Sequence, residues 1–408
     1  MTGAPRHRGD LEDLLREAAP RVLAAVVRRF GDFADSEDAV QEAMIDAARQ
    51  WPAQGTPESP IGWLIAVASR RMTDRIRADS ARRAREERLA VEPEPGPTAE
   101  ADDSLALIFM CCRPELTPAS AVALTLRAVG GLSTAQIAAA FLVPEKTMGR
   151  RIARAKGTVA EAAEPFGLPA GEERKERLRT VLSVLYLIFN EGYAASEGAE
   201  LARTELSGEA IRLTRIAHLA LPGEPEVGGL LALMLLTDAR RPARADARGE
   251  LVPLDEQDRS LWDAAAIAEG QRVLNEAIAL GAVGPYQLQA AIAAVHDRAP
   301  RAEDTDWSEI LALYGLLEGV APGPMIALNR AVATAMAEGP RAGLDLLAEV
   351  EPKLEGHHRV HAVRAHLLEL AGEGEAAHAE YVRAAELTAS LPEQRYLTKR
   401  AARLATAA

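Results

Sequence analysis

Aromatic residues, cysteines and long apolar runs are all scarce in this chain of 408 residues. Phe, Trp and Tyr make up 4% of it and no run of alternating β-branched residues stands out, which favours an all-helical protein. The two cysteines, Cys111 and Cys112, are neighbours, so they cannot form an ordinary disulfide, and no Cys/His spacing offers a zinc site. We interpret both as helix-packing residues.

The sequence also lacks a membrane-spanning segment and a signal peptide, the two features that would direct the protein to or across a membrane. No uncharged apolar stretch approaches the roughly 18 residues that a membrane-spanning helix needs. The N-terminal residues MTGAPRHRGDLEDLL lack the apolar core of a signal peptide. We therefore expect a cytoplasmic protein without a membrane partner.

Charge is unevenly distributed along a chain whose net charge is −13. Residues 1–90 are neutral overall, and residues 91–104 contain acids but no base. Residues 161–408 hold 25 basic and 38 acidic residues. This distribution predicts that only the N-terminal part binds nucleic acid, because an acidic C-terminal part is repelled by DNA and suits a protein partner.

The stretch from Leu116 to Val159 predicts two short helices, a tight turn and a third, basic helix. Thr117-Pro118 and Ser133 are helix starts, Gly130-Gly131 ends the first helix, and Pro144 opens the last one. The stretch carries six bases against the single acid Glu145. A helix-turn-helix unit whose last helix is basic is typical of proteins that read bases in the DNA major groove and bind the phosphates of the backbone. A solvated charged face is the alternative.

Two further helices are predicted upstream. The first begins at Asp35 or Ser36 and shows Asp38 and Glu42, four residues apart, on one side; either solvent or a basic partner balances these like charges. The second begins at Pro60 and is rich in arginine, which suits phosphates and base edges better than a core. Trp63 lies near its start, where core packing is favoured over base stacking.

Taken in order, DSEDAVQEAMIDAARQW, PIGWLIAVASRRMTDRIR and the helix-turn-helix stretch resemble three characteristic segments of bacterial sigma factors of the extracytoplasmic-function type. In that family, a first helical domain binds the RNA polymerase clamp and the minus-10 promoter element, and a second reads the minus-35 element. The resemblance covers roughly the first 160 residues.

The resemblance also implies site residues. Binding to core RNA polymerase falls on Asp38, Gln41 and Glu42. Binding to the minus-10 DNA falls on Trp63, Arg70, Arg71, Asp74, Arg75 and Arg77. Binding to the minus-35 DNA falls on Ser133, Lys146, Thr147, Arg150, Arg151 and Arg154. The sequence departs from the family at Met148-Gly149, where Val and a base are usual, so we expect Gly149 to remove a side chain that faces the groove.

The resulting expectation is an all-α protein with four parts: a sigma region-two domain at 1–88, an acidic, Pro-rich linker at 89–104, a helix-turn-helix sigma region-four domain at 105–162, and a tetratricopeptide-like helical solenoid at 172–408. The linker is either a tether or, as in the family, a segment that threads through the polymerase.

The C-terminal part is predicted to be a stack of helical hairpins. After an apolar helix that ends near LYLIFNEGY, ten more helices are expected, at 207–221, 226–240, 259–280, 285–297, 306–318, 323–338, 340–350, 356–371, 374–389 and 392–406. Arg330 aligns with Arg364 at the 34-residue tetratricopeptide period. The whole chain thus resembles the sigma-factor group with a fused tetratricopeptide-like domain. Asn190, Glu191 and Tyr193 either line a candidate regulatory groove or cap a helix.

No enzymatic chemistry is predicted. His357, His358, His361 and His366 share one helix, but no carboxylate or Cys completes a metal site at matching spacing, so we expect no metal, no cofactor and no catalysis. One hypothesis is therefore a sigma factor that binds core RNA polymerase and promoter DNA and is controlled by its own C-terminal domain or by a regulatory protein or ligand bound there. The alternative is a DNA-binding adaptor with a protein-binding solenoid and no polymerase role.

Overall fold

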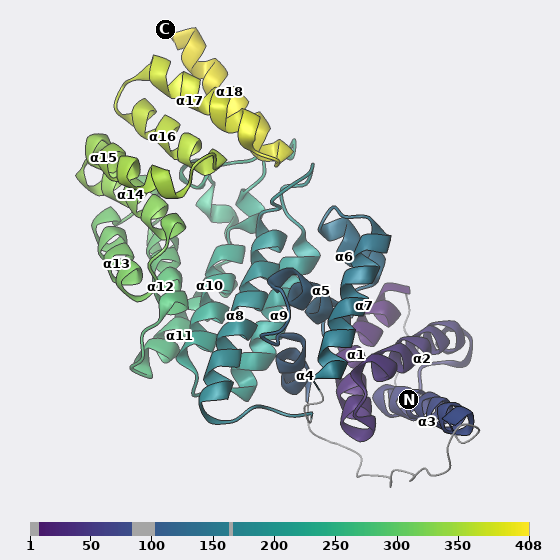
Figure 1. Cartoon of the computed structure of the whole chain (residues 1–408). Coiled ribbons are helices and arrows are strands. Elements are labelled where there is room, and N and C mark those ends of the chain that lie inside the picture. Colours follow the sequence, from purple (N-terminus) through teal and green to yellow (C-terminus); the bar gives the residue numbers. More distant parts are fainter. Residues whose placement is uncertain (1–7, 84–102, 163–165, 408) are drawn as a thin grey trace. The chain divides into compact units, whose positions relative to one another are not determined.

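The computed structural model describes residues 8–83, 103–162 and 166–407 (Figure 1). Within these ranges the chain forms eighteen α-helices, short 3-10 helices and no β-strand apart from two isolated bridges, which confirms the all-α fold class. None of the described helices combines the length and the apolar character that crossing a bilayer requires. The predicted linker at 89–104 falls almost wholly outside the described residues.

The chain divides into two compact units, residues 1–187 (unit 1) and 188–408 (unit 2). The division falls inside helix α8 (Gly171–Tyr193), whereas the sequence placed the start of the C-terminal domain at residue 172. The first half of α8 packs in unit 1, where the guanidinium of Arg177 donates to the carbonyl oxygen of Phe109 at 3.3 Å.

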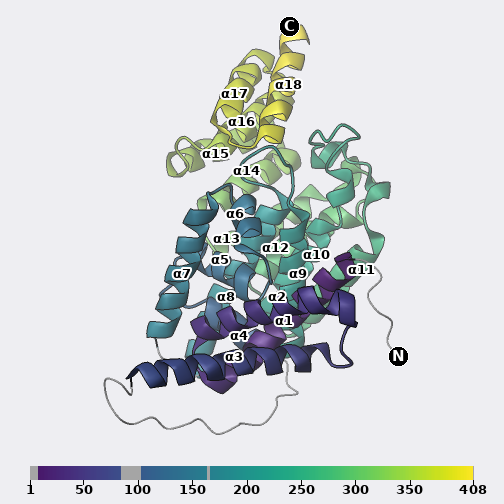
Figure 2. The same cartoon turned by 90° about the vertical axis from the view of Figure 1, so that its right-hand side faces the viewer.

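Unit 1 begins with three packed helices, α1 (Arg8–Phe30), α2 (Phe33–Gln54) and α3 (Pro60–Arg83), which lie side by side in both views (Figures 1 and 2). α1 is continuous through Pro20. α2 begins earlier than predicted because Asp32, not Asp35 or Ser36, caps it: the Asp32 carboxylate accepts the backbone N–H of Asp35 at 2.8 Å. Ser36 is buried instead.

Four helices complete the described part of unit 1 before α8: α4 (Ser104–Cys111), α5 (Pro118–Ala128), α6 (Thr134–Ala140) and α7 (Glu145–Glu161). Thr117 and Ser133 cap α5 and α6 as predicted. Cys111 and Cys112 are fully buried, and burial raises the pKa of both thiols, in keeping with a packing role. α4 and α5 pack on α1, and α7 packs on α2.

All ten helices predicted for the C-terminal part are present, with ends within five residues of those expected. Their bounds are α9 (Thr204–Ala220), α10 (Pro225–Asp238), α11 (Ala264–Ala279), α12 (Pro285–Arg298), α13 (Trp307–Val320), α14 (Pro324–Glu338), α15 (Pro340–Val350), α16 (His358–Leu370), α17 (Gly374–Leu387) and α18 (Leu391–Ala407).

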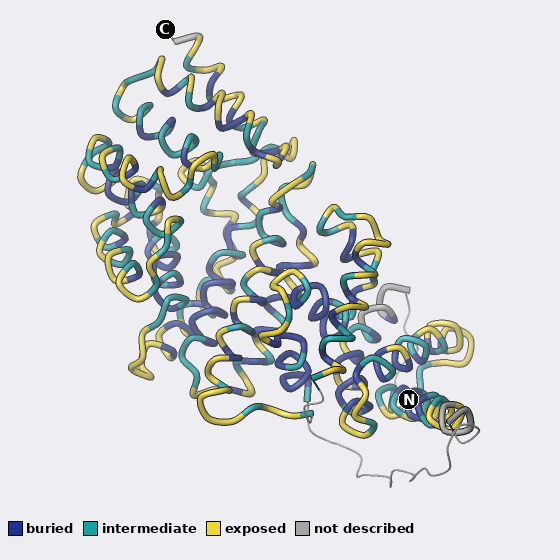
Figure 3. Tube along the Cα trace, viewed as in Figure 1, coloured by how far each residue is buried: buried dark blue, intermediate teal, exposed yellow. Residues whose placement is uncertain are grey.

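The predicted repeat is visible in the helix starts. α14 and α16 begin at Pro324 and His358, and α15 and α17 begin at Pro340 and Gly374, so both pairs repeat after 34 residues. Gly343 permits the close crossing of α14 and α15, since a Cβ there would lie 2.5 Å from the Cβ of Ala335. Each hairpin buries its inner face, as the dark blue stretches of Figure 3 show.

Candidate functional site

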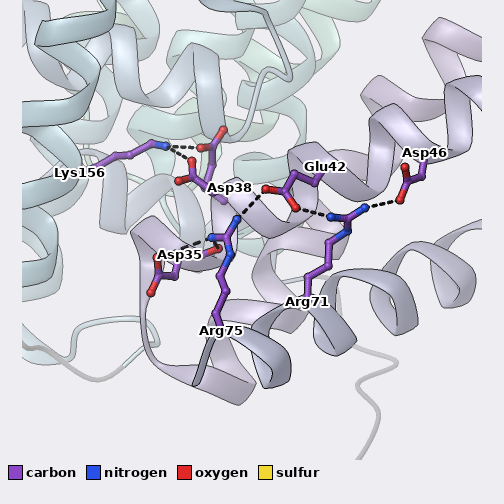
Figure 4. Close-up of polar contacts among 8 residues, drawn as sticks. Asp35, Asp38, Glu42, Asp46, Arg71, Arg75 and Lys156 are labelled. Atoms are coloured by element: carbon purple, nitrogen blue, oxygen red, sulfur yellow. Dashed lines mark hydrogen bonds and ion pairs between the residues drawn. The ribbon is translucent and has the colours of Figure 1, made fainter. Parts of the chain in front are cut away.

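The acidic face of α2 is largely neutralised by arginines of α3 (Figure 4). Arg71 forms ion pairs with Glu42 and Asp46, and Arg75 donates to a Glu42 carboxylate oxygen at 2.8 Å and to the backbone carbonyl of Asp35 at 3.2 Å. The hydrogen bond to Asp46 raises the pKa of Arg71. The basic partner that the sequence suggested for Glu42 therefore exists within the chain.

A second set of contacts joins α2 to the helix-turn-helix part. Glu37 is only 1% exposed, and its carboxylate accepts from the Nε of Arg127 in α5 at 2.9 Å and from the Nζ of Lys156 in α7. Lys156 also reaches the carboxylate of exposed Asp38 at 3.0 Å (Figure 4). Sequence reasoning missed Glu37, because an acid in the first turns of a helix ordinarily serves only the helix dipole.

The remaining predicted residues of α3 divide into two groups. Arg70, Asp74 and Arg77 are exposed and form no ion pair with any described residue. Trp63 is half-buried, and its ring meets the edge of Trp51 in α2 with centroids 5.4 Å apart. The open face of α3 thus carries Arg70 and Arg77, while Arg71 and Arg75 face α2.

The basic face of α7 is open. Lys146, Thr147, Arg150 and Arg154 are exposed, Arg151 is half-buried, and none of the four cations forms an ion pair with a described residue. Their opposite face, Met148, Ile152, Ala155 and Val159, is buried. Helical spacing therefore separates the packing residues from the cations.

Two positions near the start of the basic helix have unusual surroundings: Leu142, in the turn before α7, and Gly149, inside α7. Leu142 has φ of 49°, a left-handed conformation that costs a residue with a side chain about 1 kcal/mol or more. A Cβ on Gly149 would meet the methyl group of Thr134 in α6 at 3.9 Å, an ordinary van der Waals distance, and the residue is half-exposed. That Gly149 removes a groove-facing side chain stays a prediction. Ser133 is committed to a capping box with Gln136.

The fourth predicted set, Asn190, Glu191 and Tyr193, lies at the end of α8. The Glu191 carboxylate binds Arg203 and accepts the Ser196 hydroxyl at 2.8 Å, and Tyr193 stacks on Phe189 beneath the Arg244 guanidinium, 3.9 Å from the ring centroid. Asn190 is exposed. A Cβ on Gly192 would lie 2.2 Å from the backbone nitrogen of Ser207, so the close packing of α8 on α9 requires glycine there.

The histidines at the start of α16 and along it contact one another and acids of α17 and α18. His361 contacts Glu380 at 2.7 Å, His358 lies 3.2 Å from Glu393, and the His357 and His358 rings stack. Among the described residues, no group of three or more His, Cys, Asp or Glu side chains could hold a metal ion.

Comparison with known families covers most of the chain. Residues 14–82 match Sigma-70 region 2, residues 106–169 match Sigma-70, region 4, and residues 177–278 match a family of unknown function, DUF6596. The first two matches coincide with α1–α3 and with α4–α7.

Individual relatives agree with the family matches. An uncharacterized protein of Rhizobium meliloti is 41% identical over 401 residues, which are 95% of this chain and 94% of that protein. The ECF RNA polymerase sigma factor SigK of Mycobacterium ulcerans is 30% identical over 158 residues, which are 34% of this chain and 84% of SigK. The crystal structure of the yeast Tom70 aligns with 98% of this chain and 86% of that one, at a TM-score of 0.32 and 12% identity, which is too low a similarity to support an argument.

Proposed function

Because this chain belongs to the extracytoplasmic-function family of RNA polymerase sigma factors, and so binds core polymerase and promoter DNA, we propose which of its surfaces make each contact and how its C-terminal unit controls them. The open cationic face of α7 is the observation that carries the proposal. An amphipathic helix that buries its apolar side and leaves four cations without an ion-pair partner among the described residues is suited to a polyanion.

The minus-35 contact is assigned to α7. Lys146, Thr147, Arg150 and Arg154 are exposed there, and Arg151 lies at the edge of the same face. Ser133 contributes indirectly. Its capping box fixes the start of α6, and this in turn sets the angle at which α7 meets the DNA.

The minus-10 contact is assigned to the open face of α3. Arg70, Asp74 and Arg77 are exposed and free to meet DNA, while Arg71 and Arg75 hold α3 against α2 through Glu42 and Asp46. Trp63 packs on Trp51 with part of its surface open, which leaves a face for a base.

The polymerase contact is assigned to α2, with Asp38 as its main charge. Asp38 has 57% of its side chain exposed, whereas Glu42 is shared between two arginines. Gln41 lies half-buried beside both. Exposed Asp38 is therefore the carboxylate best placed to meet a basic partner surface.

Control is assigned to unit 2. A relative matches the chain across both units, so the two parts occur together in one polypeptide beyond this protein. The region from residue 161 onward carries 13 more acids than bases, which disfavours DNA nearby and offers a surface for a regulatory protein.

The minus-35 assignment is tested by salt dependence. Replacing Arg150 and Arg151 with Ala should weaken promoter binding and make the negative slope of log K against log salt shallower by about 0.9 for each lost phosphate contact. Binding of the polymerase holoenzyme to promoter DNA is measured at several salt concentrations. Arg248→Ala, which removes an exposed arginine of unit 2, is the control and should leave the slope unchanged. An unchanged slope in the double variant contradicts the assignment.

The polymerase assignment is tested on α2. Asp38→Arg should weaken binding to core polymerase by about tenfold or more, because reversing a charge at an interface places like charges opposite each other. Glu58→Arg makes the same charge change on an exposed loop of unit 1 and serves as the matched control. Equal affinities of the two variants for core polymerase would show that Asp38 is not part of the interface.

A further inference from the structure

Unit 2 contains a cavity of about 430 Å³ whose wall is assembled from segments far apart in sequence. Two short 3-10 helices, η2 (Leu254–Glu256) and η3 (Arg259–Leu261), contribute to it together with α12, α13, α14 and α16. This volume falls within the roughly 300–1,000 Å³ that small-molecule sites occupy in proteins. None of the predicted site residues lies in it.

One wall of the cavity carries a permanent cation. Arg259 donates through Nη1 to the backbone carbonyls of His296 and Ala299, both at 2.6 Å, so it is held in place by the end of α12. No carboxylate of a described residue forms an ion pair with it, and its Nε–H is buried without an acceptor. A guanidinium in this state favours an anion close by.

The two histidines of the wall, His296 and His366, are neutral. Burial, with help from Arg240 and Arg259, lowers the pKa of His296 to about 3, and burial also lowers the pKa of His366. The exposed Asn329 has no hydrogen-bond partner among the described side chains. Asp255 lies exposed at the wall and is its one carboxylate.

Most of the remaining wall is apolar and aromatic. The Trp307 ring of α13 meets the His296 ring edge-on, with centroids 5.2 Å apart. Tyr314 of α13 and Val332 and Met336 of α14 continue this surface. Such a surface accommodates a ring, while the few polar groups select its substituent.

We propose that this cavity binds a small organic carboxylate with an aromatic body, the ring lying between α13 and α14 and the carboxylate directed toward Arg259. The inference goes beyond the sigma-factor role. It holds whether or not unit 2 controls transcription, because its test measures binding alone.

The test titrates the full-length chain with 1-naphthylacetate in a calorimeter, up to millimolar concentration, and compares 1-naphthylmethylamine, which has the same ring and the opposite charge. The carboxylate should bind at least about tenfold more tightly than the amine, because the amine brings a cation to an unpaired guanidinium.

Two variants locate the site without touching Arg259, whose loss would also release the end of α12. Val332→Trp places a large ring inside the cavity and should abolish binding of 1-naphthylacetate. Leu316→Trp makes a similar addition at a side chain of α13 that is 61% exposed and outside the cavity wall, and should bind as the unchanged chain does. Circular dichroism confirms that both remain folded.

Several results would overturn the proposal: no heat of binding for 1-naphthylacetate, equal affinity for the amine, or full binding by Val332→Trp. A tetrapeptide that ends in Phe with a free carboxylate is titrated in parallel. If the peptide binds in a Val332-dependent manner and 1-naphthylacetate does not, the cavity is a peptide site and the proposal is wrong.

Discussion

At the scale of single residues, His296 should make the C-terminal unit sensitive to acid. Its folded pKa of about 3 lies below the value near 6.5 of an unfolded histidine, so below pH 6.5 the unfolded chain takes up a proton that the folded chain does not. Stability therefore falls as the pH drops from 6.5 toward 3. Between pH 6.5 and 4.5, the loss due to this one residue is about 2 kcal/mol.

The variant His296→Gln isolates the loss of stability that is due to His296, because the variant and the unchanged chain share all other titrating groups. The free energy of unfolding, measured by urea titration at pH 6.5 and at pH 4.5, should fall less in the variant than in the unchanged chain by about 2 kcal/mol. His361→Gln serves as the comparison, since His361 contacts Glu380. Equal acid sensitivity in the unchanged chain and His296→Gln would mean that the imidazole is protonated in the folded state.

Glu37 shows which part of the site cannot be found from sequence. Its partners Arg127 and Lys156 lie 90 and 119 residues away, and both were counted among the charges offered to DNA. Helical spacing places residues three or four apart on one face, but it holds no information on pairing between distant helices. The exposed cations of α7 were predictable, because burial of Met148 and Ile152 dictates which side remains open.

At the scale of elements, if α3 and α7 bind the two promoter elements as proposed, the contact of α2 with α7 is incompatible with simultaneous binding of both. Elements centred about 25 base pairs apart are separated by roughly 85 Å of duplex. α7, with 17 residues, is about 25 Å long. A chain that keeps Lys156 on Glu37 and Asp38 cannot place α3 and α7 that far apart. We therefore expect these ion pairs to break when promoter DNA is bound.

Lys156→Met should shift the chain toward the open arrangement. The substitution removes the charge that pairs with Asp38 and Glu37 but keeps the apolar part of the side chain. The surface of α2 is then more available to core polymerase. Affinity for core polymerase, measured in the absence of DNA, should rise by about threefold. Lys146→Met removes a cation of the same helix that forms no ion pair with a described residue, and it should leave the affinity for core polymerase unchanged. If both variants bind core polymerase alike, the contact does not restrain the protein.

Helix positions were the most predictable feature at this scale, and for a clear reason. In unit 2, Pro opens α10, α12, α14 and α15, and glycine stands beside several of these turns, so local residues mark the ends. The start of α2 was less predictable because Asp32, Asp35 and Ser36 are all competent caps, and in the fold Asp32 caps the helix while Ser36 is buried within it.

At the scale of the whole molecule, the chain joins a DNA-binding part to a strongly acidic one. Residues 105–160 carry seven bases and two acids, whereas residues 161–408 carry the excess of 13 acids. Covalent connection keeps this negative charge on every molecule that approaches DNA. Its effect on the approach is long-range and so depends on ionic strength, with a Debye length of about 10 Å at 0.1 M salt.

Neutralising part of that charge should speed association with DNA at low salt. Glu205, Glu338 and Glu355 are exposed and form no ion pair with a described residue, so replacing all three with Gln removes charge without breaking contacts. The association rate of the holoenzyme with promoter DNA, measured by stopped flow, should rise about twofold at 0.05 M salt and stay unchanged at 0.5 M, where screening suppresses the field. The triple Glu→Asp variant keeps the charge and should match the unchanged chain. A rise that persists at 0.5 M, or that Glu→Asp reproduces, would mean that unit 2 acts through contacts and not through its charge.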